Sequence, residues 1–209
     1  LSYSEPIWQG LGDRCVFIEI VRHPLYMVRQ LALNMSHLLD DVRDFTIYYA
    51  YKGRELPYWA NGWEKDYLNS NSMERVIHFI DQLTHRTKVA RKKLKEEYQD
   101  KLITIPFELF VLNPEPWLKQ IADALETNII DSTRVVMSEQ NVPRKMVGDG
   151  IDIEIYKRCG WVPPQEGTTE RDELRIRRED VVKEISNELI PVLDRLNDEY
   201  EKMYWSPDT

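Results

Sequence analysis

An apolar run over residues 14–21, ending at Arg22-His23-Pro24, limits the possible folds of this chain more than any other segment. Its β-branched and aromatic residues predict a strand buried on both faces, as in a parallel sheet. Proline cannot donate to a sheet ladder and suits the first turn of a helix, so the strand is expected to stop there. Apolar residues then recur at helical spacing over 25–39. The first predicted unit is therefore a strand, a sharp turn and a helix.

A second apolar run, residues 102–107, predicts another buried strand. A turn at Asn113-Pro114 follows it, and Pro116 opens an amphipathic helix. Strands that alternate with helices indicate an α/β fold with a mainly parallel sheet flanked by helices. Two strands are few for such a sheet, so we expect it to be incomplete at its amino-terminal side.

Two long amphipathic segments and one aromatic stretch make up much of the remaining chain. Residues 72–98 predict a helix with Ser72 as its N-cap. Residues 179–204 predict a carboxy-terminal helix that Pro191 kinks or splits. The aromatic stretch 45–63 is compatible with a hairpin or with a loop lined by aromatic residues, and its first part also with a helix.

Composition and charge limit the ligands and the location of the protein. The chain is 42% apolar and 11% aromatic, as in a folded globular protein. Its net charge is −8, from 28 basic and 36 acidic side chains, and this disfavours nucleic-acid binding, which needs a basic face. The basic run 86–95 is expected to be the solvated face of a helix, with docking of an anionic acceptor as the alternative.

No membrane span is expected, because no window approaches the roughly 18 consecutive apolar residues that one requires. The chain has two cysteines, a usage that favours a reducing compartment. We therefore expect a soluble, cytoplasmic protein. No spacing of cysteine and histidine suits a metal site.

Arg22 directly follows the carboxyl end of the first predicted strand and precedes a helix. In open α/β sheets ligands bind at this edge. A guanidinium group offers a rigid fork of donors to a phosphate, and the start of the helix adds a positive end. The alternative is a surface arginine that pairs with a nearby carboxylate.

The corner resembles that of sulfotransferases that use 3′-phosphoadenosine-5′-phosphosulfate (PAPS). In this family a strand ends in Arg-x-Pro, and a serine follows the arginine by eight residues; both bind the 3′-phosphate of the donor. The resemblance implies that Arg22 is a 3′-phosphate ligand. Gln30 stands at the serine position, and its amide can also donate to a phosphate oxygen. The family's upstream glycine-rich loop has no counterpart, since Gly10-Leu11-Gly12 precedes a strand instead of following one.

Two more segments resemble the same family and follow in its order. Residues 103–110 are similar to a strand end with Glu108 at the family's glutamate position and Phe107 in place of tyrosine. In an otherwise irregular stretch, residues 143–149 resemble the Arg-Lys-Gly loop that closes over the donor, with Met146 in place of the first glycine.

The resemblance implies that Arg144 and Lys145 join Arg22 at the 3′-phosphate. Residues 1–209 would then form a single, partial sulfotransferase-like domain with a P-loop-like fold. The implied activity is transfer of a sulfuryl group from PAPS to a hydroxyl or amine, without a metal. No residue is singled out as the catalytic base. A nucleotide-dependent phosphotransferase and a non-catalytic sulfotransferase-like binding module are the alternatives.

Three aromatic residues are candidates for an acceptor pocket: Tyr58, Trp59 and Trp63. Aromatic faces suit sugars and phenols, so the expected acceptor is a small molecule or a carbohydrate. Packing of these rings in the core is the alternative.

Overall fold

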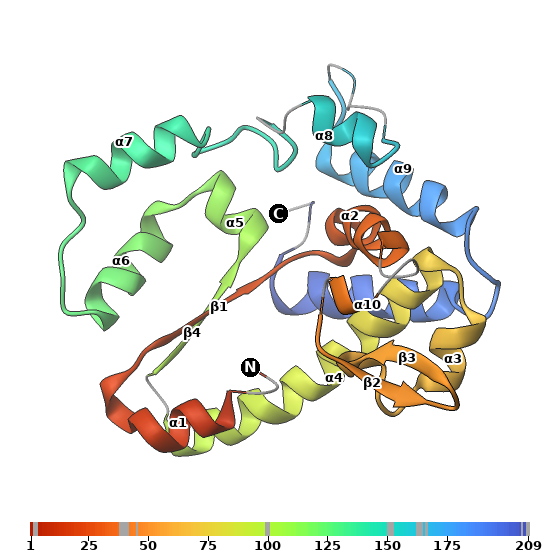
Figure 1. Ribbon diagram of the computed structural model, residues 1–209. Helices are drawn as coiled ribbons and strands as arrows, with labels where there is room; N and C mark the ends of the chain where they lie inside the picture. Colours follow the sequence, from red (N-terminus) through yellow and green to blue (C-terminus); the bar gives the residue numbers. More distant parts are fainter. Residues whose placement is uncertain are drawn as a thin grey trace. The chain divides into compact units, whose positions relative to one another are not determined.

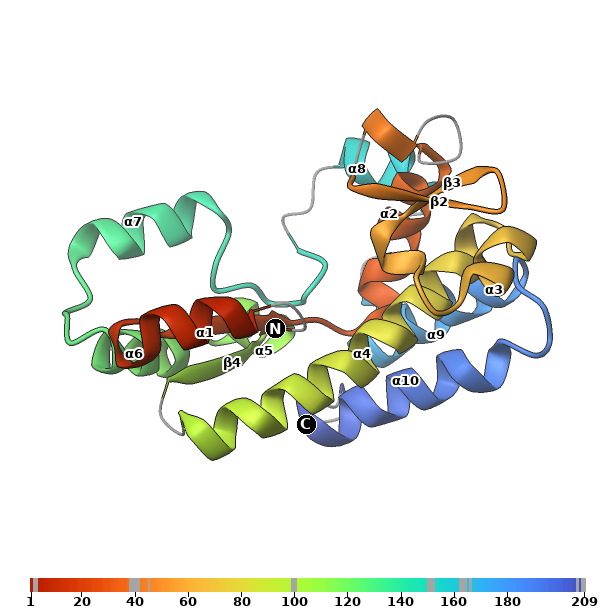
Figure 2. The same cartoon turned by 60° about the horizontal axis from the view of Figure 1, so that its bottom comes forward.

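The computed structural model describes residues 1, 4–37, 42–44, 46–98, 101–149, 153–161, 165, 167–205 and 207. The chain divides into two compact units, and their elements are labelled in Figure 1 and Figure 2. Unit 1 comprises Leu1–His23, Leu83–Ile153 and Glu201–Thr209, and unit 2 comprises Pro24–Gln82 and Glu154–Tyr200. Each unit thus combines segments that are far apart in the sequence. The expected single domain over 1–209 stays a prediction.

Unit 1 contains a two-stranded parallel sheet (Figure 1). Strand β1, Phe17–Val21, pairs with β4, Leu102–Pro106, along its whole length. Because parallel strands run in the same direction, both carboxyl ends lie at one edge of the sheet. Arg22 and Phe107 are the next residues beyond that edge. A mixed α/β fold with a parallel sheet flanked by helices is thereby confirmed.

On one face of this sheet the side chains of β4 are buried, whereas those of β1 are exposed. Ile18 and Ile20 pair with Ile103 and Ile105, and paired residues of neighbouring strands point to the same side. Ile103 and Ile105 are each 3% exposed, whereas Ile18 is 42% and Ile20 is 66% exposed. The expectation that the first strand is buried on both faces is therefore wrong, because the packing on this face covers β4 and leaves β1 open.

The opposite face of the sheet carries a half-buried ion pair. Glu19 on β1 accepts hydrogen bonds from Nη2 of Arg91 at 2.8 Å and from Oγ1 of Thr104 at 3.1 Å. Arg91 belongs to the part of α4, Ser72–Glu97, that lies in unit 1. Its side chain is 14% exposed. The expected solvated basic face is therefore wrong at Arg91, because the carboxylate on the sheet draws this side chain inward.

Short helices complete unit 1. Trp8 of the first helix stacks on Phe17 with 3.7 Å between ring centroids, which fixes this helix to the start of β1. Prolines lie in the first turns of α1 and α6, where a missing N–H has no cost. The helices of unit 1 are α1 (Glu5–Leu11), η1 (Gly12–Arg14), α5 (Phe107–Leu112), α6 (Glu115–Ala124) and α7 (Asp131–Glu139).

Unit 2 is mostly helical and contains one hairpin. Strands β2 (Tyr48–Tyr51) and β3 (Arg54–Pro57) pair antiparallel across Lys52 and Gly53. Both turn residues have positive φ, 48° and 76°, as a type I′ turn requires. The hairpin interpretation of the aromatic stretch is thereby confirmed. The helices are α2 (Pro24–His37), η2 (Val42–Asp44), η3 (Tyr58–Ala60), α3 (Glu64–Asn69), the start of α4, α8 (Ile153–Arg158), α9 (Glu170–Val182) and α10 (Ile190–Met203), whose last residues, from Glu201 on, belong to unit 1.

The segment 179–204, which was expected to be kinked or split at Pro191, is split into two helices, and the break lies at residues 183–189, before Pro191. α9 begins earlier than predicted, at Glu170, and ends at Val182. α10 begins at Ile190, with Pro191 in its first turn, as a proline without an N–H allows. None of the helices in the described part of the chain combines the length and the hydropathy of a membrane-spanning segment.

Candidate functional site

The corner that follows β1 lies in a buried setting within unit 1. The side chains of His23 and Glu108 are both 0% exposed. The backbone N–H of His23 donates to Oε1 of Glu108 at 3.0 Å. Nε2 of His23 lies 3.4 Å from Oε1 of Glu201, and the ring of Trp205 packs edge-on against the imidazole at 6.3 Å between centroids. The backbone directly after Arg22 is therefore held by a buried carboxylate.

The structure brings together two of the predicted donor-binding residues. The guanidinium carbon of Arg22 lies 4.6 Å from the ring centroid of Phe107, and that of Arg144 lies 5.9 Å from the same centroid. Both distances are within the range of cation–π attraction. Phe107 is the first residue of α5, directly beyond the carboxyl end of β4. One aromatic ring thus holds two cations that are far apart in the sequence.

Arg144 reaches this ring from a loop that is fixed by its own hydrogen bonds. The backbone N–H of Arg144 donates to the carbonyl oxygen of Val111 at 2.7 Å, which ties the loop to α5. Its Nη1 donates to the carbonyl oxygen of Val147 at 2.9 Å, and the N–H of Met146 donates to Oδ2 of Asp149 at 2.8 Å. The side chain of Lys145 is exposed. The loop therefore places Arg144 on Phe107 and directs Lys145 to the solvent.

The arrangement suits an anion that carries more than one negative charge. Two guanidinium groups repel each other, and the electron-rich face of an aromatic ring offsets part of this repulsion. A guanidinium group can present a fork of donors to the oxygen atoms of a phosphate or sulfate. That of Arg144 also donates from Nε to the carbonyl oxygen of Asn141 at 3.3 Å. Lys145 adds a third positive charge beside Arg144 in the sequence. A phosphate monoester is one ligand class with the charge to match such a cluster.

The other predicted site residues belong to unit 2. Gln30 is exposed on α2, and Tyr58 is 41% exposed on η3. Trp63 is 5% exposed, and its Nε1 donates to the carbonyl oxygen of Trp59 at 2.9 Å. The rings of these two tryptophans stack at 6.0 Å between centroids. Trp63 lies in a hydrophobic cluster with Leu56, Ala60 and Tyr67, and Trp59 packs against that cluster.

Sequence reasoning left four residues of the corner without a role. Phe107 and Glu108 were expected only to mark a strand end, yet they contact the Arg22-His23 corner directly. Their position in the sequence could have predicted this role, because they follow the second parallel strand as Arg22 follows the first. Glu201 and Trp205 gave no signal, since they lie 178 and more residues beyond His23.

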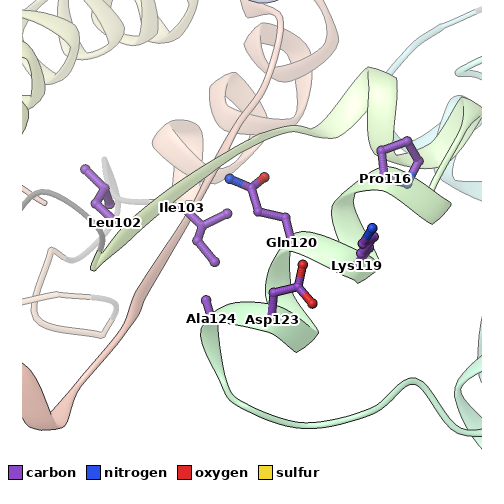
Figure 3. Close-up of a pocket in the computed structure, with 7 residues that line it drawn as sticks. All are labelled: Leu102, Ile103, Pro116, Lys119, Gln120, Asp123 and Ala124. Carbon is purple, nitrogen blue, oxygen red and sulfur yellow. The ribbon is translucent and has the colours of Figure 1, made fainter.

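A groove in unit 1 lies beside β4 (Figure 3). It has a volume of about 540 Å³ and lies between the start of β4 and α6. Figure 3 shows Gln120 and Asp123 on α6, the helix that faces Leu102 and Ile103 across the groove. Its two charged residues, Lys119 and Asp123, balance each other. This groove is therefore a weaker anion site than the arginine pair.

No group of three or more His, Cys, Asp or Glu side chains within the described residues is arranged to hold a metal ion. Comparison with protein-family models, curated proteins and solved structures finds no match to this chain. The function is therefore inferred from the residues of the site.

Proposed function

We propose that this chain is a sulfotransferase-like protein that binds PAPS through Arg22 and Arg144 and transfers its sulfuryl group to a hydroxyl or amine. The observation that carries the proposal is the position of both guanidinium groups over Phe107, at the carboxyl edge of two parallel strands. Ligands of open α/β sheets bind at this edge. The P-loop-like sulfotransferase fold is part of the same proposal.

The 3′-phosphate of the donor is the group that the arginine pair would hold. This phosphate carries close to two negative charges at neutral pH, which matches the charge of two guanidinium groups. During transfer, the sulfur–oxygen bond to the donor breaks and a bond to the acceptor oxygen or nitrogen forms. The acceptor's proton passes to the solvent, and adenosine 3′,5′-bisphosphate leaves with the electron pair of the broken sulfur–oxygen bond. The arginines contact a group that donor and product share, so they contribute to the binding of both.

Calorimetry with adenosine 3′,5′-bisphosphate and the complete protein tests the proposal. We expect Arg22→Ala and Arg144→Ala each to weaken binding by about 2 kcal/mol, or roughly 30-fold, because each removes a charge-assisted partner. Lys145→Ala removes an exposed charge and is expected to cost about 1 kcal/mol or less. Arg134→Ala is the matched control, since Arg134 pairs with Glu115 at the surface of unit 1.

The outcomes separate the candidate functions. Absence of binding to the wild-type protein would refute the donor site, and an unchanged affinity in Arg22→Ala would show that Arg22 is only structural. Tight binding of adenosine 3′,5′-bisphosphate without sulfuryl transfer to a panel of hydroxyl and amine acceptors would indicate a binding module. Preference for a 5′-triphosphate with Mg²⁺ would indicate a phosphotransferase.

A further inference from the structure

Glu108 is a fully buried acid at the start of α5. Burial of a carboxyl group is costly unless hydrogen bonds compensate for the lost water. One of these bonds comes from the backbone N–H of His23, 85 residues earlier in the chain, at 3.0 Å. A buried acid is thus used to hold the peptide bond between Arg22 and His23.

The position of that peptide bond decides where Arg22 points. Its six atoms are coplanar, so fixing its N–H also fixes the backbone on the Arg22 side. The direction of the Arg22 side chain follows from this backbone. The neighbouring residue, Phe107, contacts the far end of the same side chain at 4.6 Å. Phe107 and Glu108 therefore hold Arg22 at its guanidinium group and at its peptide bond.

We infer that Glu108 is a positioning residue for Arg22, which it orients through the backbone N–H of His23. The inference rests on the proposed function for its ligand. The hydrogen bond from His23 to Glu108 can be measured without any ligand. Removal of the acceptor oxygen is expected to free the peptide bond and to let Arg22 leave the geometry that matches the phosphate.

Three variants separate positioning from stability. Glu108→Leu removes the acceptor and leaves neither a large cavity nor a buried charge. Glu108→Gln keeps an acceptor oxygen at the same distance along the side chain. Ile103→Ala is the control for general destabilisation, since Ile103 is 3% exposed on β4 in the same unit. If Glu108→Leu does not fold, Glu108→Ala replaces it.

The first measurement is amide hydrogen exchange of His23 without ligand. We expect slow exchange in the wild type and in Glu108→Gln, and exchange at least about tenfold faster in Glu108→Leu than in Ile103→Ala, because a lost hydrogen bond exposes that amide directly. Equal exchange in Glu108→Leu and Ile103→Ala would overturn the inference. This result does not depend on whether the protein binds a nucleotide.

The second measurement is a double-mutant cycle with adenosine 3′,5′-bisphosphate. We expect Glu108→Leu to weaken binding about tenfold in the wild-type background and to have little effect in the Arg22→Ala background, since coupled residues are not additive. Glu108→Gln is expected to restore most of the affinity. Additive losses would overturn the role of Glu108 toward Arg22. If the wild-type protein does not bind adenosine 3′,5′-bisphosphate, the proposed function is refuted, whereas the conclusion from hydrogen exchange is unaffected.

Discussion

Glu74 on α4 joins the start of this helix to a turn 112 residues later, within unit 2. Its Oε2 accepts the N–H of Asn71 at 3.0 Å, and its Oε1 accepts the N–H of Ser186 at 2.9 Å. In return, Oδ1 of Asn71 accepts the N–H of Glu74 at 3.0 Å. The N-cap is therefore Asn71, and the prediction of Ser72 is wrong. An acid three residues after Asn71 is the signal of a capping box that identifies the correct residue.

We expect the stabilisation by Glu74 to depend on pH. Burial raises the pKa of Glu74, but the N–H groups of Asn71 and Ser186 outweigh this and hold the pKa below its ordinary value. A depressed pKa in the folded state means that the stabilisation is fully present above the unfolded pKa of about 4.3 and is lost as the pH falls through the folded value. Glu74→Gln should therefore lower the free energy of unfolding by about 1 kcal/mol at neutral pH and by less in acid.

Urea denaturation at neutral and acidic pH measures this difference. Glu188→Gln is the control, because Glu188 is exposed in the same unit. A difference between Glu74→Gln and the wild type that stayed constant across the pH range would contradict the role assigned to the carboxylate.

Among the elements, α9 is one that the sequence pattern located poorly. Its inward face combines Leu174 and Val181 with the buried pair Glu173 and Arg177. Nε of Arg177 donates to Oε1 of Glu173 at 2.8 Å, and the guanidinium carbon lies 4.6 Å from the ring centroid of Tyr26. Charged residues occupy core positions here, so the apolar periodicity that predicts a helix is interrupted. The capping box of Thr169 and Asp172 was the available signal for its start.

The elements that were predicted well carry their signal in adjacent residues. The parallel strands and the helix after Pro24 follow from apolar runs and from proline chemistry, both of which are local. In the site, Arg22 and Arg144 were predicted from a resemblance to a family, and the structure places both on one ring. Neither the contact with Phe107 nor the bond from His23 to Glu108 was predicted, because both join residues distant in the sequence.

Two glycines should respond to the same substitution with opposite signs. Gly53 in the hairpin turn has φ of 76°, while Gly10 lies inside α1. A Cβ atom added at either position meets nothing within 4 Å, so only the backbone conformation matters. We expect Gly53→Ala to destabilise the protein by about 1 kcal/mol and Gly10→Ala to stabilise it by about 0.5–1 kcal/mol. Chemical denaturation measures both, and equal signs would contradict the assigned conformations.

At the scale of the whole molecule, the open side of β1 should govern association in solution. Among the described residues β1 pairs only with β4, and Ile18 and Ile20 are exposed beside buried neighbours. Parallel sheets are normally covered on both faces, and a bare apolar strand edge pairs readily with other chains. The exposed face of β1 is therefore the place where a charge is expected to matter for solubility.

Ile20→Lys is expected to reduce self-association with a change in the free energy of unfolding of less than about 0.5 kcal/mol, because Ile20 is already in water. Ile105→Lys, at the paired buried position, is expected to cost more than about 3 kcal/mol. Light scattering across a concentration series measures the first effect, and denaturation measures the second. Unchanged scattering of Ile20→Lys would show that association occurs elsewhere.

Strand β1 also sets the order of events while the chain is being synthesised. Its residues pair with β4 residues made 85 positions later, as Glu19 and Thr104 illustrate. At about 5–20 residues per second, β1 emerges from the ribosome roughly 4–17 s before its partner. The contact between His23 and Glu201 forms later still, because Glu201 is synthesised 178 residues after His23. The sheet can therefore form on the nascent chain well before the corner that holds Arg22 is complete. A ribosome that stalls in α10 before Glu201 would present β1 and β4 without the Glu201 carboxylate that lies beside His23.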